Sequence, residues 1–74
     1  MEEYLDYTDF VLLYDKGFVH ELFSSLWGTD KSGTEWCVEP DALGGYLQFH
    51  QRLASGGLSP RRTMTRTEFT ETFG

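Results

Sequence analysis

The chain has 74 residues and a formal net charge of −6 at pH 7, which predicts one small acidic domain over residues 1–74. Its single cysteine, Cys37, excludes an internal disulfide and a structural zinc site built on several cysteines. The acidic balance argues against non-specific binding to phosphate backbones or anionic lipid, and no apolar run reaches the roughly 18 residues of a membrane span.

The longest apolar-rich run, residues 9–27, predicts one long amphipathic helix. Its apolar side chains recur every three or four residues, and the stripe consists of Val11, Tyr14, Phe18, Leu22 and Leu26. Gly28 follows as the expected C-terminal cap. The alternative is a strand, a turn over residues 15–17 and a shorter helix, because Gly17 costs a helix about 1 kcal/mol relative to alanine.

A loop over residues 28–33 and an extended connector over residues 34–38 are expected next. The second predicted helix covers residues 40–55, because Pro40 suits the first position of a helix and apolar side chains again share one face. That face consists of Leu43, Tyr46, Leu47, His50, Leu53 and Ala54. The glycine pair at 44–45 indicates either the close approach of another backbone or a later start of the helix.

The end of the chain predicts a short C-terminal helix over about residues 66–73. Thr65 and Glu68 have the spacing of a capping box, and Met64 and Phe69 have that of a hydrophobic staple. The threonines at 63, 65 and 67 alternate and would instead favour a strand.

Together these elements predict an all-α fold, a small three-helix bundle in which the first helix is the long central element. The alternative is an α+β fold, with a small hairpin that includes residues 34–38 or with a strand in the threonine-rich tail.

Aromatic residues make up 16% of the chain, which is high for so short a domain. Most of them are expected in the core. Phe10, Phe23 and Trp27 fall outside the predicted stripe, and Trp36 falls in a predicted loop. Because aromatic side chains amid polar residues are enriched at protein interfaces, these four are candidate partner-binding residues.

Acidic residues concentrate in the N-terminal half. Residues 1–41 hold ten acids and two lysines, a net charge of −8, whereas residues 42–74 hold two acids and four arginines, a net charge of +2. If the first helix extends backwards, Glu2, Asp6 and Asp9 repeat about every 5–6 Å along it, close to the phosphate spacing of nucleic acid. They are then candidate partner-binding residues that mimic a nucleic-acid backbone; the alternative is a solvated face that maintains solubility.

Arg61, Arg62 and Arg66 form the basic patch of the C-terminal half. Arginine clusters contact phosphate, but a nucleic-acid-binding domain is usually basic throughout. Pairing with acids of the same chain, or of a second subunit, is the favoured interpretation of this patch.

The candidate soft metal ligands are His20, Cys37 and His50. None of them occurs at the spacing of paired ligands, and His20 and Glu21 are adjacent, so they point to different sides of a helix. No glycine-rich phosphate loop or cofactor motif is recognisable. We therefore predict no enzyme activity, no metal and no cofactor, unless Cys37 and a histidine converge in space.

The leading functional hypothesis is a small acidic regulator or inhibitor that binds a larger protein. The surface that it binds on that protein is basic, for example a surface that itself binds nucleic acid. Small inhibitors of phages and other mobile elements have this composition, so a viral protein in the host cytoplasm fits it, and a cytoplasmic location is expected. The alternative is a self-associating structural or assembly protein, such as a homodimer, whose acidic and basic ends meet head to tail. DNA or RNA binding through the arginine patch is a third hypothesis, and its affinity would fall steeply with salt.

Overall fold

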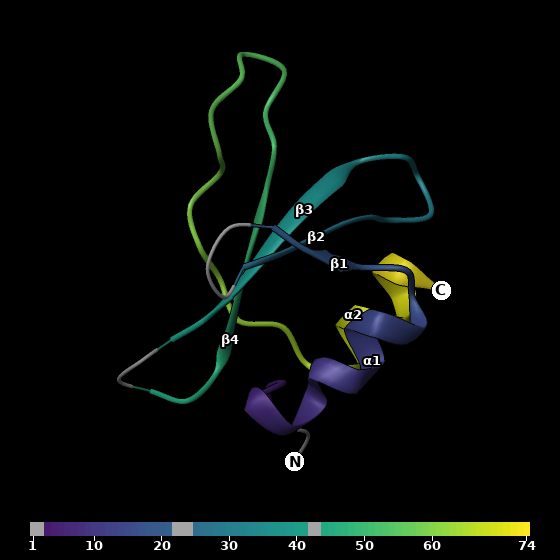
Figure 1. Cartoon of the computed structure of the whole chain (residues 1–74), viewed down its shortest axis with the longest axis vertical. Coiled ribbons are helices and arrows are strands. Elements are labelled where there is room, and N and C mark those ends of the chain that lie inside the picture. The colour runs from purple at the N-terminus through teal and green to yellow at the C-terminus, as the bar shows by residue number, and fades with distance from the viewer. Residues whose placement is uncertain (1–2, 22–24, 42–43) are drawn as a thin grey trace.

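The computed structural model describes residues 3–21, 25–41 and 44–74, and its architecture is α+β (Figure 1). Within these residues a four-stranded antiparallel sheet has the strand order β1-β2-β3-β4. The strands are β1 (Val19–His20), β2 (Leu26–Thr29), β3 (Glu35–Pro40) and β4 (Leu47–Gln51). The 3-10 helix η1 (Tyr7–Asp9) continues into α1 (Phe10–Asp15), and α2 (Arg66–Phe73) is the last element.

Both helices contribute to a single core on one face of the sheet. Figure 1 shows α1 and α2 together beside the sheet, while the long loop after β4 extends from its other end. The buried core residues of the helices and strands are Leu13, Leu26, Trp36, Val38, Leu47, Phe49, Phe69 and Phe73. The opposite face of the sheet carries Cys37 and His50, which are paired across β3 and β4. No helix of the described segments is long and apolar enough to cross a membrane.

The predicted three-helix bundle is wrong, and the first error is the long helix over residues 9–27. The helix α1 ends two residues before Gly17, which adopts a left-handed φ of +88°. The Gly17 amide donates to the Tyr14 carbonyl (3.0 Å), and the Phe18 amide donates to the Leu13 carbonyl (3.1 Å). These two bonds form the Schellman arrangement of a helix C-terminus, so the chain reverses at this point.

The predicted apolar stripe therefore does not lie on one helix. Val11 and Tyr14 are 59% and 47% exposed, whereas Leu13, which is outside the stripe, is fully buried. Phe18 and Leu26 are buried, but they reach the core from a turn and from β2. The helical spacing of these apolar residues is therefore a coincidence, because the chain reverses direction between Tyr14 and Phe18.

The alternative interpretation of this segment predicted a turn over residues 15–17, of which 16 and 17 form the turn while Asp15 ends α1, but it reversed the order of strand and helix. The helix precedes the turn, and β1 follows it. Gly28, predicted as a helix cap, lies inside β2. Leu22 and Phe23 fall outside the described residues.

The second predicted helix, over residues 40–55, is also wrong. Pro40 lies opposite Leu47 at the end of an antiparallel ladder between β3 and β4. Gly45, with a φ of +76°, helps to turn the chain between these strands. Leu47 and Phe49 are fully buried, which is the two-residue period of a strand rather than a helical period. The α+β alternative was therefore the correct class.

The short C-terminal helix is confirmed, with the bounds Arg66–Phe73. Its capping box forms in both directions, because the Glu68 amide donates to the Thr65 hydroxyl (3.2 Å) and the Thr65 amide donates to the Glu68 carboxylate (3.1 Å). Met64 and Phe69 both lie in the core, as a hydrophobic staple requires.

Gly28 provides the space that Phe18 occupies in the core. A Cβ atom at Gly28 would lie 2.5 Å from Cδ1 of Phe18, which is shorter than any tolerable contact. The Phe18 ring is 2% exposed and packs edge-to-face on Phe73 of α2, with the ring centroids 5.2 Å apart. Because Gly28 has no side chain, Phe18 from the turn after α1 can pack against the sheet and against α2 at the same time.

The turn between β2 and β3 is organised by the Asp30 carboxylate. It accepts hydrogen bonds from the Ser32 and Thr34 amides (2.8 and 3.0 Å) and from the Trp36 indole (2.9 Å). Burial by itself raises the pKa of Asp30, but these hydrogen bonds outweigh burial and hold the pKa below its ordinary value of 3.8. The ionised Asp30 carboxylate therefore stabilises the folded state.

We predict that Gly28→Ala lowers the free energy of unfolding by about 1–3 kcal/mol, because the added methyl group forces the Phe18 ring out of its position. Urea denaturation followed by tryptophan fluorescence measures this loss. The matched control is Gly57→Ala, whose Cβ would meet only the Ser55 hydroxyl at 3.9 Å; it should change stability by less than about 0.5 kcal/mol. Equal stability of the two variants would contradict the packing described for Phe18.

We predict that Asp30→Ala lowers the free energy of unfolding by about 1.5–3 kcal/mol at pH 7, because it removes hydrogen bonds to a charged group. The pKa of Asp30 is lower in the folded state than in the unfolded state. Its contribution to stability is therefore fully present at pH values above the pKa of the unfolded state, and it is lost as the pH falls through the pKa of the folded state. The difference between wild type and Asp30→Ala should therefore shrink when denaturation is repeated at pH 3 and below. Asp15→Ala, at an exposed carboxylate, is the control; a pH-independent difference for Asp30→Ala would contradict this role.

Candidate functional site

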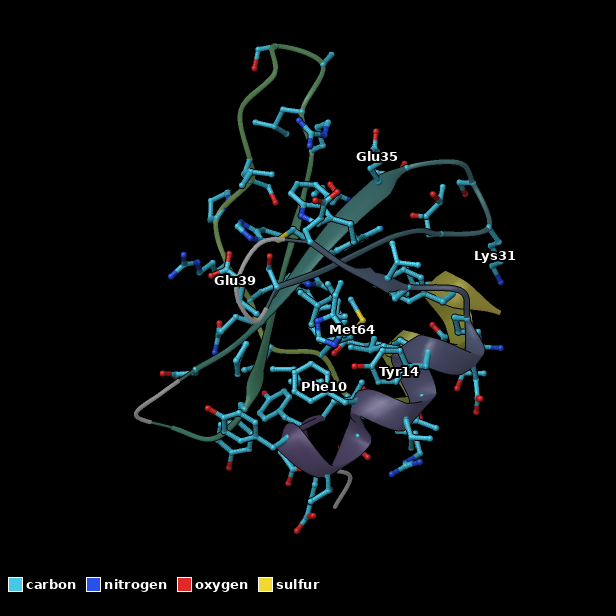
Figure 2. All side chains as sticks on the ribbon, viewed as in Figure 1. Phe10, Tyr14, Lys31, Glu35, Glu39 and Met64 are labelled. Carbon is cyan, nitrogen blue, oxygen red and sulfur yellow. The ribbon has the colours of Figure 1, made fainter. Side chains whose placement is uncertain are left out.

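The helical segment η1–α1 presents aromatic and aliphatic side chains to solvent. Tyr7, Phe10, Val11 and Tyr14 stand at positions i, i+3, i+4 and i+7, so they share one side of the helix. Tyr7, Val11 and Tyr14 are 45%, 59% and 47% exposed, and Phe10 is half-buried against the edge of the core. Figure 2 shows Phe10 and Tyr14 projecting from the same side of this segment.

Two further tyrosines extend this surface at the start of the helix. The rings of Tyr4 and Tyr46 pack edge-to-face with their centroids 6.0 Å apart, and both side chains are more than 40% exposed. The Tyr7 amide donates to the Gly45 carbonyl (3.3 Å), which holds the helix beside the turn that precedes Tyr46. We call this surface the aromatic face; it consists of Tyr4, Tyr7, Phe10, Val11, Tyr14 and Tyr46.

The sequence analysis included Phe10 among the candidate partner-binding residues, but not the other members of the aromatic face. Val11 and Tyr14 had been assigned to the core, because a stripe at helical spacing usually faces inward. The spacing from Tyr7 to Tyr14 was visible in the sequence. Leu13 lies on the other side of the helix and is fully buried, and only this burial, which the structure shows, orients the helix.

The predicted acidic row does not form along a helix. Asp6 has an extended backbone and caps η1, where its carboxylate accepts bonds from the Thr8 amide (2.9 Å) and hydroxyl (2.7 Å). These bonds, with the hydroxyl contributing most, hold the pKa of Asp6 below its ordinary value. The Asp9 carboxylate accepts a bond from the Asp6 amide (2.9 Å) and pairs with Arg66 (3.1 Å). Glu2 lies outside the described residues.

The predicted basic patch is separated into ion pairs within the chain, as the favoured interpretation expected. Its pairs are Arg61–Glu39 (3.2 Å), Arg62–Glu68 (3.0 Å) and Arg66–Asp9 (3.1 Å). Outside the patch, Arg52 pairs with Glu35 (3.5 Å). Six exposed charges form no ion pair with the residues that the structure describes; they are Glu3, Asp15, Lys16, Glu21, Lys31 and Glu71. Each of these arginines therefore has an acidic partner within the same chain.

The predicted aromatic anchors lie in different environments. Trp27 is half-buried on the sheet, where the Arg52 guanidinium lies 4.5 Å from its ring centroid. Trp36 lies in β3 and is 5% exposed, so it belongs to the core rather than to an accessible surface. Phe23 is outside the described residues, and Phe10 lies in the aromatic face.

The structure brings Cys37 and His50 together with Glu39 on the face of the sheet opposite the core. Cys37 pairs directly with His50 across the ladder, and Glu39 is two residues further along β3, on the same face. The Glu39 Oε1 atom lies 3.8 Å from the Cys37 Sγ atom and 3.1 Å from the His50 Nε2 atom. Cys37 and His50 are 3% and 4% exposed. Arg61 holds the second carboxylate oxygen of Glu39 at 3.2 Å.

The sequence did not place these three residues together because the predicted second helix hid the strand pairing. The available signal was that Cys37 lies in the segment predicted to be extended, over residues 34–38, and that Glu39 follows it by two residues just beyond that segment. His20 does not join them; its Nε2 atom contacts the Tyr14 hydroxyl beside the aromatic face.

The environment of Cys37 does not activate it as a nucleophile. Burial foremost, and then the charge and hydrogen bond of Glu39, raise the pKa of Cys37 to about 11, so the thiol is protonated at neutral pH. A reactive cysteine requires a thiolate with a lowered pKa. What the three side chains offer instead is a converging set of sulfur, nitrogen and oxygen donor atoms.

Two features of the described chain can therefore engage another molecule. The aromatic face has exposed apolar surface on a folded helix, and the Cys37–Glu39–His50 cluster has donor atoms on the sheet. No protein-family model, curated protein or solved structure matches this chain.

Proposed function

We propose that this chain is a small acidic regulator of the inhibitor type, which docks onto a larger protein through the aromatic face. The observation that carries the proposal is the set Tyr7, Phe10, Val11 and Tyr14 at i, i+3, i+4 and i+7, largely exposed on a short folded helix. Helices that bind in a groove of another protein use anchors at this spacing. Tyrosine is also among the residues that dominate interface energies.

The helix that carries the aromatic face is already fixed in the free chain. Leu13 anchors it in the core, and the hydrogen bonds at Gly17 close its C-terminal end. A preorganised helix loses less conformational entropy on binding than a disordered segment would. Tyr4 and Tyr46 support each other by their edge-to-face packing, so part of the tyrosine surface is ordered as well.

Charge complementarity supports a partner with a basic rim around an apolar groove. The net charge is −6 and the arginines are paired internally. Glu3 and Asp15 are exposed next to Tyr4 and Tyr14 in the sequence, without an ion pair in the described chain. Such a distribution attracts a basic surface and repels a second copy of the same chain. A surface that binds nucleic acid is basic in this way.

Recognition by a row of carboxylates that copies phosphates receives no support, because Asp6 and Asp9 are used in the cap of η1. Head-to-tail self-association receives none either, since Arg61, Arg62 and Arg66 are paired with acids of the same chain. A second copy of the chain could occupy the aromatic face instead, and sedimentation distinguishes that case from docking onto a larger protein.

We predict that Val11→Lys weakens binding to the partner at least about tenfold, which corresponds to roughly 1.4 kcal/mol. The lysine places a charge in the apolar contact and opposes a basic surface. The partner is captured from the source cell with the immobilised wild-type chain, identified by mass spectrometry and purified, and its affinity for each variant is then measured by calorimetry. Binding should also weaken with salt, because exposed acids contribute to it.

The matched control is Val19→Lys, which makes the same change at a residue of β1 that is 61% exposed, against 59% for Val11. It should bind as wild type does, and circular dichroism should show both variants folded. Equal loss of affinity in the two variants would contradict docking through the aromatic face. Sedimentation that detects a dimer lost only in Val11→Lys would assign the face to self-association and overturn the proposal.

A further inference from the structure

We propose that Cys37, Glu39 and His50 form a binding site for a divalent transition-metal ion, and that the ion is zinc. The three residues each offer one donor atom, and these atoms lie within 4.8 Å of one another. This inference is independent of docking through the aromatic face, which lies on another part of the molecule.

The donor distances fit a tetrahedral ion. Zinc bonds of about 2.3 Å to sulfur and about 2.0–2.2 Å to nitrogen and oxygen place neighbouring donors roughly 3.4–3.6 Å apart. The Nε2 atom of His50 is 3.1 Å, and the Sγ atom of Cys37 is 3.8 Å, from Oε1 of Glu39. Two of the three donor separations are thus close to the tetrahedral values, and the third, between the Cys37 sulfur and the imidazole of His50, is at most 4.8 Å.

The backbone holds these side chains in position before any ion arrives. Cys37 and His50 are direct partners in the β3–β4 ladder, so their Cα separation is set by the hydrogen bonds of the sheet. Glu39 follows Cys37 by two residues and points to the same face. A rigid scaffold of this kind lowers the entropy cost of assembling ligands.

The charge balance also favours a divalent ion. On binding, the ion displaces the proton of the Cys37 thiol to solvent. The resulting thiolate, the Glu39 carboxylate and the neutral His50 imidazole then contribute a charge of −2, which a divalent cation cancels. Arg61 holds the Glu39 Oε2 atom at 3.2 Å and leaves Oε1 directed towards Cys37 and His50. A partner on the outer oxygen of a ligating carboxylate orients that ligand.

The site has a route to solvent on the Glu39 side. A hollow of about 450 Å³ is lined by Glu39, Pro40, Asp41, Gln48 and Arg61. The Glu39 side chain is 31% exposed, although Cys37 and His50 are buried. Three protein ligands leave one tetrahedral position for water. The mixture of sulfur, imidazole and carboxylate donors selects zinc over calcium and magnesium, which prefer oxygen ligands alone.

Cobalt(II), a spectroscopic substitute for zinc, tests this site in the full-length, untagged and reduced chain. We predict one bound ion per chain, with the visible bands of tetrahedral cobalt and a thiolate-to-cobalt charge-transfer band in the near ultraviolet. Zinc should displace the cobalt and abolish both sets of bands. Absence of the charge-transfer band at saturating cobalt would overturn the proposal.

The variants assign the ligands. Cys37→Ser should remove the charge-transfer band, and Glu39→Gln and His50→Gln should each weaken cobalt binding more than about 100-fold, beyond the roughly 10–100-fold loss typical of outer-sphere partners. Glu39 is the key variant, because its partial exposure allows the change without unfolding the chain. The matched control is His20→Gln, at an exposed histidine outside the cluster. Wild-type affinity in Glu39→Gln, or loss of binding in His20→Gln, would overturn the assignment.

Discussion

The fold depends on the reversal of the chain after α1. Gly17 adopts a left-handed φ of +88°, which other residues rarely adopt, and the Gly17 and Phe18 amides close the helix by bonding to Tyr14 and Leu13. Phe18 is thereby turned into the core, where it fills the space above Gly28 and packs on Phe73 of α2. The same reversal allows β1 to join the sheet, and it leaves the aromatic face of the short helix uncovered.

The parts of the fold that were predictable from sequence are those with local signals. The α2 helix was predictable because Thr65 and Glu68 specify its start by reciprocal hydrogen bonds three residues apart. The structure of residues 9–27 was not predictable, because a chain reversal can leave the spacing of the apolar residues unchanged. Gly17 lowers helix stability only slightly, and this cost does not indicate that the turn places Phe18 in the core. The β4 strand was not predictable either, because Leu47 and His50 fit the face of a helix whereas Leu47 and Phe49 fit the face of a strand, and five residues are too few to decide between the two periods. Its pairing with β3 is a non-local interaction.

The same distinction applies to the candidate functional residues. Phe10 was recognised as an aromatic residue outside the core stripe, but Tyr7, Val11 and Tyr14 could be assigned to the surface only once Leu13 was known to face inward. Cys37 and His50 were visible as separate residues, and only the register of β3 and β4 places them side by side with Glu39. Arg61, Arg62 and Arg66 pair with acids of the same chain, which the sequence analysis favoured because a chain of charge −6 offers many acidic partners.

The central claim is that a short helix, fixed by the core on one side, presents the aromatic face to a larger protein on the other. Amide hydrogen exchange, measured on the free chain and on the chain saturated with its purified partner, tests this claim most directly. The account predicts that binding slows exchange in residues 4–15 and 44–47, while β3 and the outer part of β4 exchange as in the free chain. Protection confined to β3 and β4, with residues 4–15 unchanged, would contradict it.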